Sequence, residues 1–288
     1  MSPFTADFVL KEPPALCRLL ECTRCGHRFF DVRYTLEEVG RLYAGYREEA
    51  YFACRNRHEP WYTEAFNRCV GWDERLLASR REGIAAFLGR AGLPGPFVSV
   101  LDYGGDSGQL IPPGIAREAF VFDLSGVTPV PGVTGIGREE DLAAGAYDLV
   151  LLSHVLEHAP DPGGLLAKIA PLLSPGSGLL YVEVPLERPW LGLLSRGRFG
   201  RAWLGTVRRS PVLLRTLDFY STAFRVKTGI LPPLGFAKVH EHVNAFSSSS
   251  LARVLEKAGL SILRLEETSG RKSATGPALL CLALPAAG

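Results

Sequence analysis

A glycine-rich turn follows directly after an acidic residue at the end of an apolar run. Residues 99–108 read SVLDYGGDSG, so Asp102 is followed by three glycines within six residues. Glycine has no Cβ and accepts positive φ, which lets backbone N–H groups come close to a ligand. Such groups, with a helix start behind them, bind anionic or strongly polar ligands. The pattern indicates a site for a nucleotide-like cofactor.

A second acid lies at the spacing that ribose binding requires. Asp123 ends the run EAFVFD and stands 21 residues after Asp102. In a βαβ nucleotide-binding fold, an acid about 20 residues beyond the glycine turn lies at the tip of the second strand and accepts the ribose hydroxyls. An isolated Asp would simply open a turn, but after this loop we favour ribose binding.

Two histidine clusters could supply a general base. Residues 153–158 read SHVLEH and residues 238–244 read KVHEHVN. Histidine titrates near neutrality, so the candidates for acid–base catalysis are His154, His240, Glu241 and His242. The alternative is structural: Glu157 and His158 would orient a helix, and the second cluster would order a loop. The His-x-His spacing also fits a metal, but no further ligands stand out nearby, and we expect none there.

The N-terminal region contains half of a zinc-ribbon pattern. Cys22 and Cys25 stand in the sequence CTRCGH, whereas Cys17, Cys54 and Cys69 are single. A structural zinc site needs four ligands, normally from two such pairs. We therefore expect Cys22 and Cys25 to bind zinc only if a complete site exists. Otherwise the segment is degenerate, or the second pair lies upstream of Met1.

The composition is that of an ordinary globular protein. The chain has 288 residues, of which 47% are hydrophobic and 22% charged, and the net charge is +2. No nucleic-acid partner is expected from this charge. No run of 18 apolar residues or signal peptide is visible, so we expect a cytoplasmic protein. Six cysteines are too few and too irregular for a disulfide scaffold.

Strands and helices are expected to alternate through the middle of the chain. Apolar runs predict strands over 98–102, 119–123, 147–153 and 179–184, with helices over 60–92 and 163–173. Capping residues predict helix starts at Thr35 and at Ser247, and the last two strands, 261–267 and 278–284, are expected to form a hairpin. Pro112 and Pro113 leave room for only a short or irregular crossover after the glycine turn.

Four regions follow from this reading. They are a Cys-containing segment and helix (1–58), a cofactor-binding core (59–185), an inserted lid (186–246), and a helix with a β-hairpin that completes the core (247–288). The lid combines aromatic residues with arginines, which suit sugar faces and phosphates: Trp190, Phe199, Trp203, Arg188, Arg196, Arg198, Arg201, Arg208, Arg209 and Arg215. Contact with a membrane surface and a merely solvated basic face are the alternatives.

Four blocks of sequence resemble the class I S-adenosylmethionine-dependent methyltransferases. They read LDYGGDSG, FDLS, YDLVLLSHVLEH and SPGSGLLYVEVP, in this order, and the resemblance covers about residues 95–285. It implies a doubly wound α/β fold: a seven-stranded, mostly parallel, Rossmann-like sheet with an antiparallel last strand. The segment HEHVNAFS resembles sugar and small-molecule methyltransferases with an N-terminal zinc-ribbon-like segment. Asp106 departs from the family pattern, which has glycine there.

The resemblance also implies roles for single residues. Asp102, Gly104, Gly105 and Gly108 would surround the methionine part of S-adenosylmethionine. The ribose and adenine would be held by Asp123, Leu124 and Asp141, and the methyl group would face Ser153 and His154. All of these residues except Asp141 stand at the matching position of a block. Asp141 stands in the sequence EEDL between the second and third blocks, where a solvated acid at a helix start is the alternative.

The expected function is methyl transfer to a small hydroxylated metabolite, a sugar or a nucleotide- or lipid-linked sugar. The enzyme would act as a monomer or homodimer. One alternative is an NAD(P)-dependent dehydrogenase or epimerase, whose glycine turn should open a regular helix that Pro112 and Pro113 disfavour. The other is a non-catalytic binding protein that keeps the fold.

Overall fold

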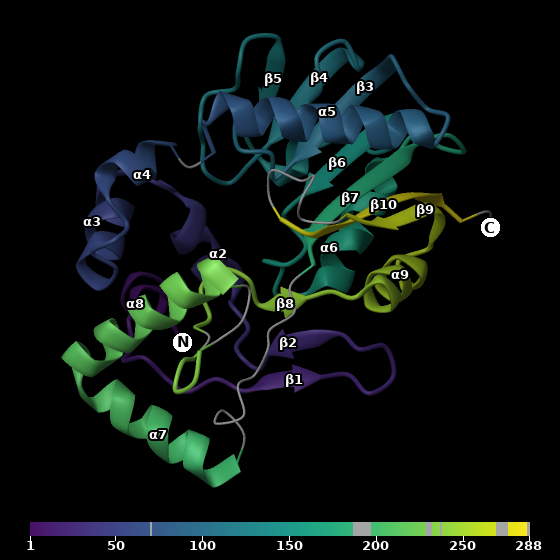
Figure 1. Cartoon of the computed structure of the whole chain (residues 1–288). Coiled ribbons are helices and arrows are strands. Elements are labelled where there is room, and N and C mark those ends of the chain that lie inside the picture. Colours follow the sequence, from purple (N-terminus) through teal and green to yellow (C-terminus); the bar gives the residue numbers. More distant parts are fainter. Residues whose placement is uncertain (70, 187–196, 229–231, 237, 269–275, 287–288) are drawn as a thin grey trace. The chain divides into compact units, whose positions relative to one another are not determined.

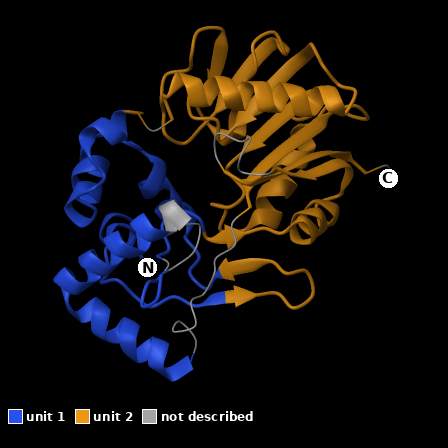
Figure 2. Ribbon diagram, viewed as in Figure 1, with its two compact units in different colours: residues 1–19, 30–68, 188–242 blue, residues 20–29, 69–187, 243–288 orange. Residues whose placement is uncertain are grey.

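The chain folds as two compact units whose segments alternate along the sequence (Figure 2). In the computed structural model, unit 1 comprises residues 1–19, 30–68 and 188–242, and unit 2 comprises residues 20–29, 69–187 and 243–288. The structure describes residues 1–69, 71–186, 197–228, 232–236, 238–268 and 276–286. Most of the predicted 186–246 insertion therefore belongs to the same unit as most of the first 58 residues.

Unit 2 is built on a seven-stranded sheet (Figure 1). The strand order is β5-β4-β3-β6-β7-β10-β9, and β10 runs in the direction opposite to the other six strands of this sheet. The predicted mostly parallel sheet with an antiparallel last strand is confirmed, whereas β5 was not among the predicted strands. The bounds are β3 (Phe97–Tyr103), β4 (Ala116–Phe122), β5 (Val133–Ile136), β6 (Leu149–Ser153), β7 (Leu179–Pro185), β9 (Leu260–Glu267) and β10 (Ala278–Pro285).

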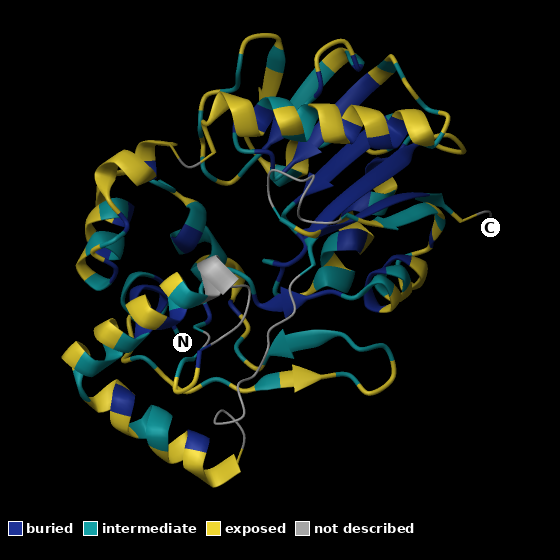
Figure 3. Cartoon of the chain, in the orientation of Figure 1, coloured by how far each residue is buried: buried dark blue, intermediate teal, exposed yellow. Residues whose placement is uncertain are grey.

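Helices cover both faces of this sheet because its central strands are apolar on both sides. Leu166 of α6 (Pro162–Ile169) and Leu251 of α9 (Ser248–Lys257) share one core, and Phe87 of α5 (Glu74–Arg90) lies in the other. Alternate strand residues enter the two cores: Leu101, Val150 and Val182 the first, and Val100, Leu151 and Tyr181 the second. Figure 3 shows the central strands as almost continuously buried.

The connection between β3 and β4 contains no helix. Residues 104–115, all of them described, form successive turns instead. Proline lacks the N–H that a continuing helix needs, so Pro112 and Pro113 prevent one from forming here. The predicted irregular crossover is confirmed.

The helix predicted over residues 60–92 is wrong in one respect, because the structure divides it. The helix α4 (Glu64–Cys69) ends before Asp73, and α5 starts after it. The Asp73 carboxylate accepts hydrogen bonds from the N–H groups of Arg75 (3.0 Å) and Leu76 (3.2 Å), which begins a new helix.

The two helix starts predicted from capping residues, at Thr35 and Ser247, are confirmed. Thr35 and Glu38 form a capping box at the start of α2 (Leu36–Tyr43), and Ser247 and Ser250 form one at the start of α9. Each box satisfies backbone N–H groups that would otherwise lack a partner in the first helical turn.

Unit 1 is largely helical. Its described elements are α1 (Pro3–Thr5), the π-helical η1 (Ala6–Leu10), α2, α3 (Glu49–His58), most of α4, α7 (Gly197–Arg209) and α8 (Pro211–Thr228). A small sheet that belongs almost entirely to unit 2, made of β1 (Leu19–Glu21), β2 (Arg28–Phe30) and β8 (Asn244–Ala245), holds the turn that carries the CTRCGH sequence. Over the described part of the chain, no helix combines the length and the apolar character needed to cross a membrane.

Candidate active site

The glycine-rich loop leaves β3 with a strongly curved backbone. Gly104 (φ 71°) and Gly108 (φ 77°) adopt the left-handed conformation that favours glycine. Asp106 (φ 56°) adopts it as well, although the family pattern has glycine at this position. Its N–H donates to Asp123 Oδ2 (2.9 Å), and its carboxylate accepts from the Gln109 side chain (3.2 Å), which holds the loop in this conformation.

Asp102 is the most unusual group of this loop. It is 1% exposed, and neither carboxylate oxygen has a hydrogen-bond partner among the described residues. Burial raises the pKa of Asp102 to about 7, although the nearby Arg80 guanidinium opposes this shift. Gly105 packs so closely against the carboxyl group that a Cβ would overlap it. Because buried carboxylates are normally paired, this one offers a place for a cationic ligand group.

Asp123 lies at the end of the neighbouring strand β4. Its Oδ1 accepts from the N–H of Ser125 (2.7 Å), and its Oδ2 accepts from the N–H of Asp106. These bonds fix the carboxylate next to the loop, and β3 pairs with β4 in parallel, so both acids lie at one edge of the sheet. Leu124 follows with 53% of its surface exposed, which leaves an apolar face for a flat ring system.

Asp141 is engaged by a neighbouring arginine. It ends the 3₁₀ turn Glu139–Asp141, where Arg138 donates to both carboxylate oxygens (3.0 and 2.9 Å). This hydrogen bonding lowers the pKa of Asp141. A contact with an adenine amino group would have to share this carboxylate with Arg138.

A buried polar cluster lies at the carboxyl ends of β6 and β7. The Ser153 hydroxyl accepts from Arg80 Nη2 (2.9 Å) and donates to Glu183 Oε2 (2.8 Å). Tyr181 also donates to Glu183 Oε2 (3.3 Å). The pKa of Glu183 falls to about 2: burial alone would raise it, but His154, Arg80 and Ser153 together outweigh that effect. Glu183 is therefore ionised at neutral pH.

His154 lies between two acids of this region. Its φ of 57° is left-handed, which is unusual for histidine. Nδ1 lies 3.2 Å from Glu157 Oε1, and Nε2 lies 3.4 Å from Glu183 Oε1. Burial alone would lower the pKa of His154, but the two carboxylates raise it to about 9. At neutral pH the side chain is thus an imidazolium, which cannot accept a proton.

This charge state predicts a pH dependence of stability. The folded pKa of His154, about 9, lies above its ordinary value of 6.5, so its contribution is complete below pH 6.5. We expect that contribution, on the order of 3 kcal/mol, to be lost between pH 6.5 and 9. Denaturant unfolding across this range, with His154→Asn for comparison, measures it. Asparagine tolerates the left-handed backbone and does not titrate, so equal slopes in both proteins would contradict the assignment.

The second histidine cluster belongs to unit 1. His240 Nε2 lies 2.7 Å from Glu59 Oε1, and Lys238 bridges Glu59 and Asp218. Burial lowers the pKa of His240, so it is neutral near pH 7, with Nε2–H donating to Glu59. Although burial opposes it, the hydrogen bond from His240 and the charge of Lys238 hold the pKa of Glu59 well below its usual range.

The residues that follow His240 in the sequence, Glu241 and His242, also belong to unit 1. Glu241 accepts from the Tyr51 hydroxyl (3.0 Å) and forms an ion pair with Arg55 (3.5 Å), and His242 is partly buried. The structure brings His154 together with the Ser153 cluster. It places His240, Glu241 and His242 in the other unit.

Cys22 and Cys25 lie in the turn between β1 and β2. Both thiols are free, and the N–H groups of Arg24 and Cys25 lower the pKa of Cys22. Among the described residues, no grouping of three metal-ligating side chains contains either of them. Zinc at this turn is thus not supported by a complete ligand set in the part of the chain that the structure describes.

Two residues of the buried polar cluster around Ser153, namely Glu183 and Arg80, were not predicted from the sequence. Glu183 is a charge within the apolar strand sequence LLYVEVP, and such a charge is rarely buried without a partner. The sequence therefore contained a signal for Glu183. It contained none for Arg80, which lies 3.7 Å from Glu183 in space but stands 103 residues earlier, on α5.

A mostly parallel sheet with acids and a glycine-rich loop at the ends of adjacent strands defines a Rossmann-like fold for a nucleotide-like cofactor. The family follows from the sequence itself. Residues 64–265 match the model of the methyltransferase domain, and the chain belongs to this family.

Solved structures with a similar architecture are distant in sequence. The 1,6-didemethyltoxoflavin-N1-methyltransferase of Burkholderia thailandensis, solved with 1,6-didemethyltoxoflavin and S-adenosylhomocysteine, is 18% identical over 95% of this chain and 100% of its own, with a TM-score of 0.48. The magnesium protoporphyrin IX methyltransferase of Synechocystis PCC 6803, solved with SAH, is 14% identical over 74% of this chain and 85% of its own, with a TM-score of 0.43. The comparison with curated proteins gave no match.

Proposed function

We propose that this protein transfers the methyl group of S-adenosylmethionine to a small hydroxylated metabolite, namely a sugar or a nucleotide- or lipid-linked sugar. The observation that carries the cofactor assignment is the unpartnered, buried carboxylate of Asp102 beside the glycine-rich loop. S-adenosylmethionine combines a cationic ammonium group, two ribose hydroxyls and a flat adenine ring. When bound, it supplies an electrophilic methyl group on a sulfonium sulfur.

The residues present fit these groups one by one. Asp102 provides the counter-charge for the ammonium group, and Gly105 keeps the space next to that carboxylate free of side-chain atoms. Asp123 accepts from the ribose hydroxyls, and Leu124 covers one face of the adenine. Asp141 is the candidate for the adenine amino group, in competition with its bond to Arg138.

The crossover after the loop favours this cofactor over a nicotinamide dinucleotide. A dinucleotide-binding loop uses the N-terminus of the following helix to hold the pyrophosphate. Residues 104–115 form no helix, so that element is missing from this described segment. S-adenosylmethionine has no phosphate and does not need it.

The protonation states divide the candidate catalytic residues. His154, held as a cation by Glu157 and Glu183, is suited to position substrate or to stabilise negative charge, not to act as a base. His240 is neutral and holds a second nitrogen, Nδ1, with no hydrogen-bond partner among the described residues. His240 Nδ1 is buried, so we propose His240, Glu241 and His242 as candidate bases for an acceptor hydroxyl on their residue types and sequence spacing alone.

The helix α7 supports an acceptor that carries phosphate. This helix contains no acidic residue, and Phe199 on it is 63% exposed. Its four arginines are also exposed: Arg198, Arg201, Arg208 and Arg209. Arginine forks bind phosphate oxygens in pairs. An anionic membrane surface would be bound by the same charges. Arg188, Trp190 and Arg196 of the predicted lid lie outside the described residues.

Calorimetry with S-adenosylhomocysteine and NAD tests the cofactor assignment. We expect S-adenosylhomocysteine alone to bind, and Asp123→Asn to weaken it about 10- to 100-fold, because a charge-assisted hydrogen bond contributes about 1.5–3 kcal/mol. Glu118→Gln, on the exposed far part of the same strand, is the matched control and should bind normally. Normal binding by Asp123→Asn would remove the ribose role from this residue.

A panel of acceptors tests the methyl-transfer step. Free sugars, nucleotide sugars and lipid-linked sugars are incubated with isotopically labelled S-adenosylmethionine, and the products are analysed by mass spectrometry. The proposal expects label on a sugar hydroxyl. Binding of the cofactor without transfer to any member would instead support the non-catalytic alternative.

A further inference from the structure

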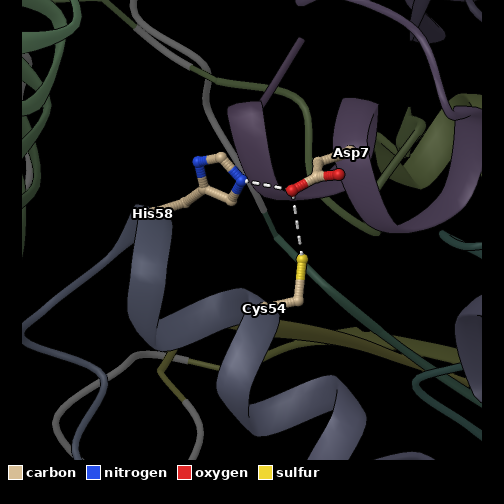
Figure 4. Close-up of side chains that lie close together, drawn as sticks. All are labelled: Asp7, Cys54 and His58. Carbon is tan, nitrogen blue, oxygen red and sulfur yellow. Dashed lines mark hydrogen bonds and ion pairs between the residues drawn. The ribbon is translucent and has the colours of Figure 1, made fainter.

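Three side chains with metal-binding atoms gather in unit 1, and none of them was given a role above. Figure 4 shows Asp7 of η1 pointing toward Cys54 and His58 of α3. Asp7 Oδ2 lies 2.8 Å from His58 Nε2 and 3.5 Å from Cys54 Sγ. All three ligand atoms lie within 4.8 Å of one another. The three atoms therefore surround one common point, where a single ion could contact all of them.

The local sequence explains why these atoms meet. Cys54 and His58 are four residues apart on α3, which places both on one face of the helix. Aromatic packing holds η1 against this helix: the ring of Tyr51 lies 5.1 Å from that of Phe4 and 5.6 Å from that of Phe8, the residue after Asp7. Cys54 is buried (7% exposed), whereas the Asp7 side chain is 43% exposed, so solvent reaches this group of ligand atoms from the side of Asp7.

The two distances from Asp7 Oδ2 can be compared with those of a tetrahedral zinc site. Bonds of about 2.0 Å to nitrogen and oxygen and about 2.3 Å to sulfur place neighbouring tetrahedral ligands about 3.3–3.6 Å apart. The Cys54–Asp7 distance already has this value. The His58–Asp7 distance is shorter by about half an ångström, so a modest side-chain movement would admit the ion.

We propose that Asp7 Oδ2, Cys54 Sγ and His58 Nε2 bind a zinc ion, with water as the fourth ligand. A thiolate and an imidazole select zinc over magnesium or calcium, which prefer oxygen ligands alone. Binding converts the Cys54 thiol to a thiolate and releases its proton to the buffer. His58 binds as a neutral imidazole with its proton on Nδ1.

The neighbouring cation does not prevent this. Arg57 Nη1 lies 3.5 Å from Asp7 Oδ2, and the arginine side chain is 65% exposed. Exposed ion pairs contribute little, so this one can be given up when zinc takes the carboxylate. The ion would then fasten η1 to α3 and stabilise unit 1.

Metal titration of the full-length protein tests the proposal. After treatment with a chelator, the protein should bind one equivalent of Zn²⁺ with release of protons and a rise in unfolding temperature. Co²⁺ at the same site should give a thiolate-to-cobalt charge-transfer band in the near ultraviolet. Cys54→Ser should remove the band, and Asp7→Asn, which keeps the side-chain shape, should weaken zinc by about 100-fold or more.

The control separates this site from the zinc-ribbon-like turn. Cys22→Ser/Cys25→Ser leaves Asp7, Cys54 and His58 intact, so it should retain both the stoichiometry and the cobalt band. Failure of the wild-type protein to bind one equivalent would overturn the proposal. So would a band that survives in Cys54→Ser and disappears in Cys22→Ser/Cys25→Ser.

Discussion

Asp102→Asn should stabilise the cofactor-free protein at pH 8 and, at the same time, weaken S-adenosylhomocysteine binding by about 100-fold or more. The carboxylate is buried without a hydrogen-bond partner among the described residues, so its charge is a cost to the empty protein. It becomes favourable only when a cationic group lies beside it. Removing one partner of such a buried pair costs about 3–5 kcal/mol of binding free energy.

The pH dependence makes this prediction sharper. The folded pKa of Asp102 is about 7 and its ordinary value is 3.8, so the folded state binds the extra proton between these values. Stability of the wild-type protein should therefore fall as the pH rises from about 4 to about 7, and the advantage of Asp102→Asn should grow over the same range. Affinity of the wild-type protein for S-adenosylhomocysteine should rise through pH 7.

Thermal unfolding and calorimetry at pH 5, 6, 7 and 8 measure both effects. Asp102→Asn should show a smaller loss of stability across this series and an affinity that does not change through pH 7. A variant that loses stability at pH 8 would mean that the Asp102 carboxylate has a partner in the empty protein.

Gly105→Ala should abolish cofactor binding and lower the free energy of unfolding by about 1–3 kcal/mol. A Cβ at this position would overlap the carboxyl carbon and both oxygens of Asp102. The φ of Gly105 is not left-handed, so the effect is steric and not a loss of glycine's conformational freedom. Either the loop or the Asp102 side chain must move, and both carry the proposed cofactor contacts.

A second glycine provides the matched control. Gly83 lies within α5, and a Cβ there would meet no atom within 4 Å. Gly83→Ala should therefore stabilise the protein by about 0.5–1 kcal/mol and leave S-adenosylhomocysteine binding unchanged. Calorimetry and denaturant unfolding of both variants measure the difference. Normal binding by Gly105→Ala would show that the space beside Asp102 is not needed for the cofactor.

Local signals predicted most of the sheet. Apolar runs marked the central strands, Pro112 and Pro113 marked the helix-free crossover, and the capping residues marked helix starts at Thr35 and Ser247. Strand β5 was missed because it lies at the edge of the sheet, where its partly exposed residues give no apolar pattern. The divided helix was missed because apolar residues continue past the Asp73 cap.

The sequence predicted the site residues that lie at strand ends. It did not predict the contacts that these residues make with partners far away in the sequence. Asp102 and Asp123 follow apolar runs directly, so topology alone brings them together. The charge of His154 depends on Glu183, which another strand supplies, and Arg80 reaches Ser153 across 73 residues of sequence. No periodicity or motif encodes such contacts, because only the completed fold creates them.

The alternation of segments between the two units has a consequence for biosynthesis. Of the seven strands of this sheet, β10 is the last to be made, yet it takes an interior position between β7 and β9. In unit 1, the N–H of Ser2 donates to the carbonyl of Val239 (2.8 Å). At about 5–20 residues per second, Ser2 waits on the order of 10–50 s for this partner. Unit 1 cannot finish folding before residue 242 is made, and the sheet of unit 2 keeps incomplete edges, exposed to chaperones, until β10 has been made.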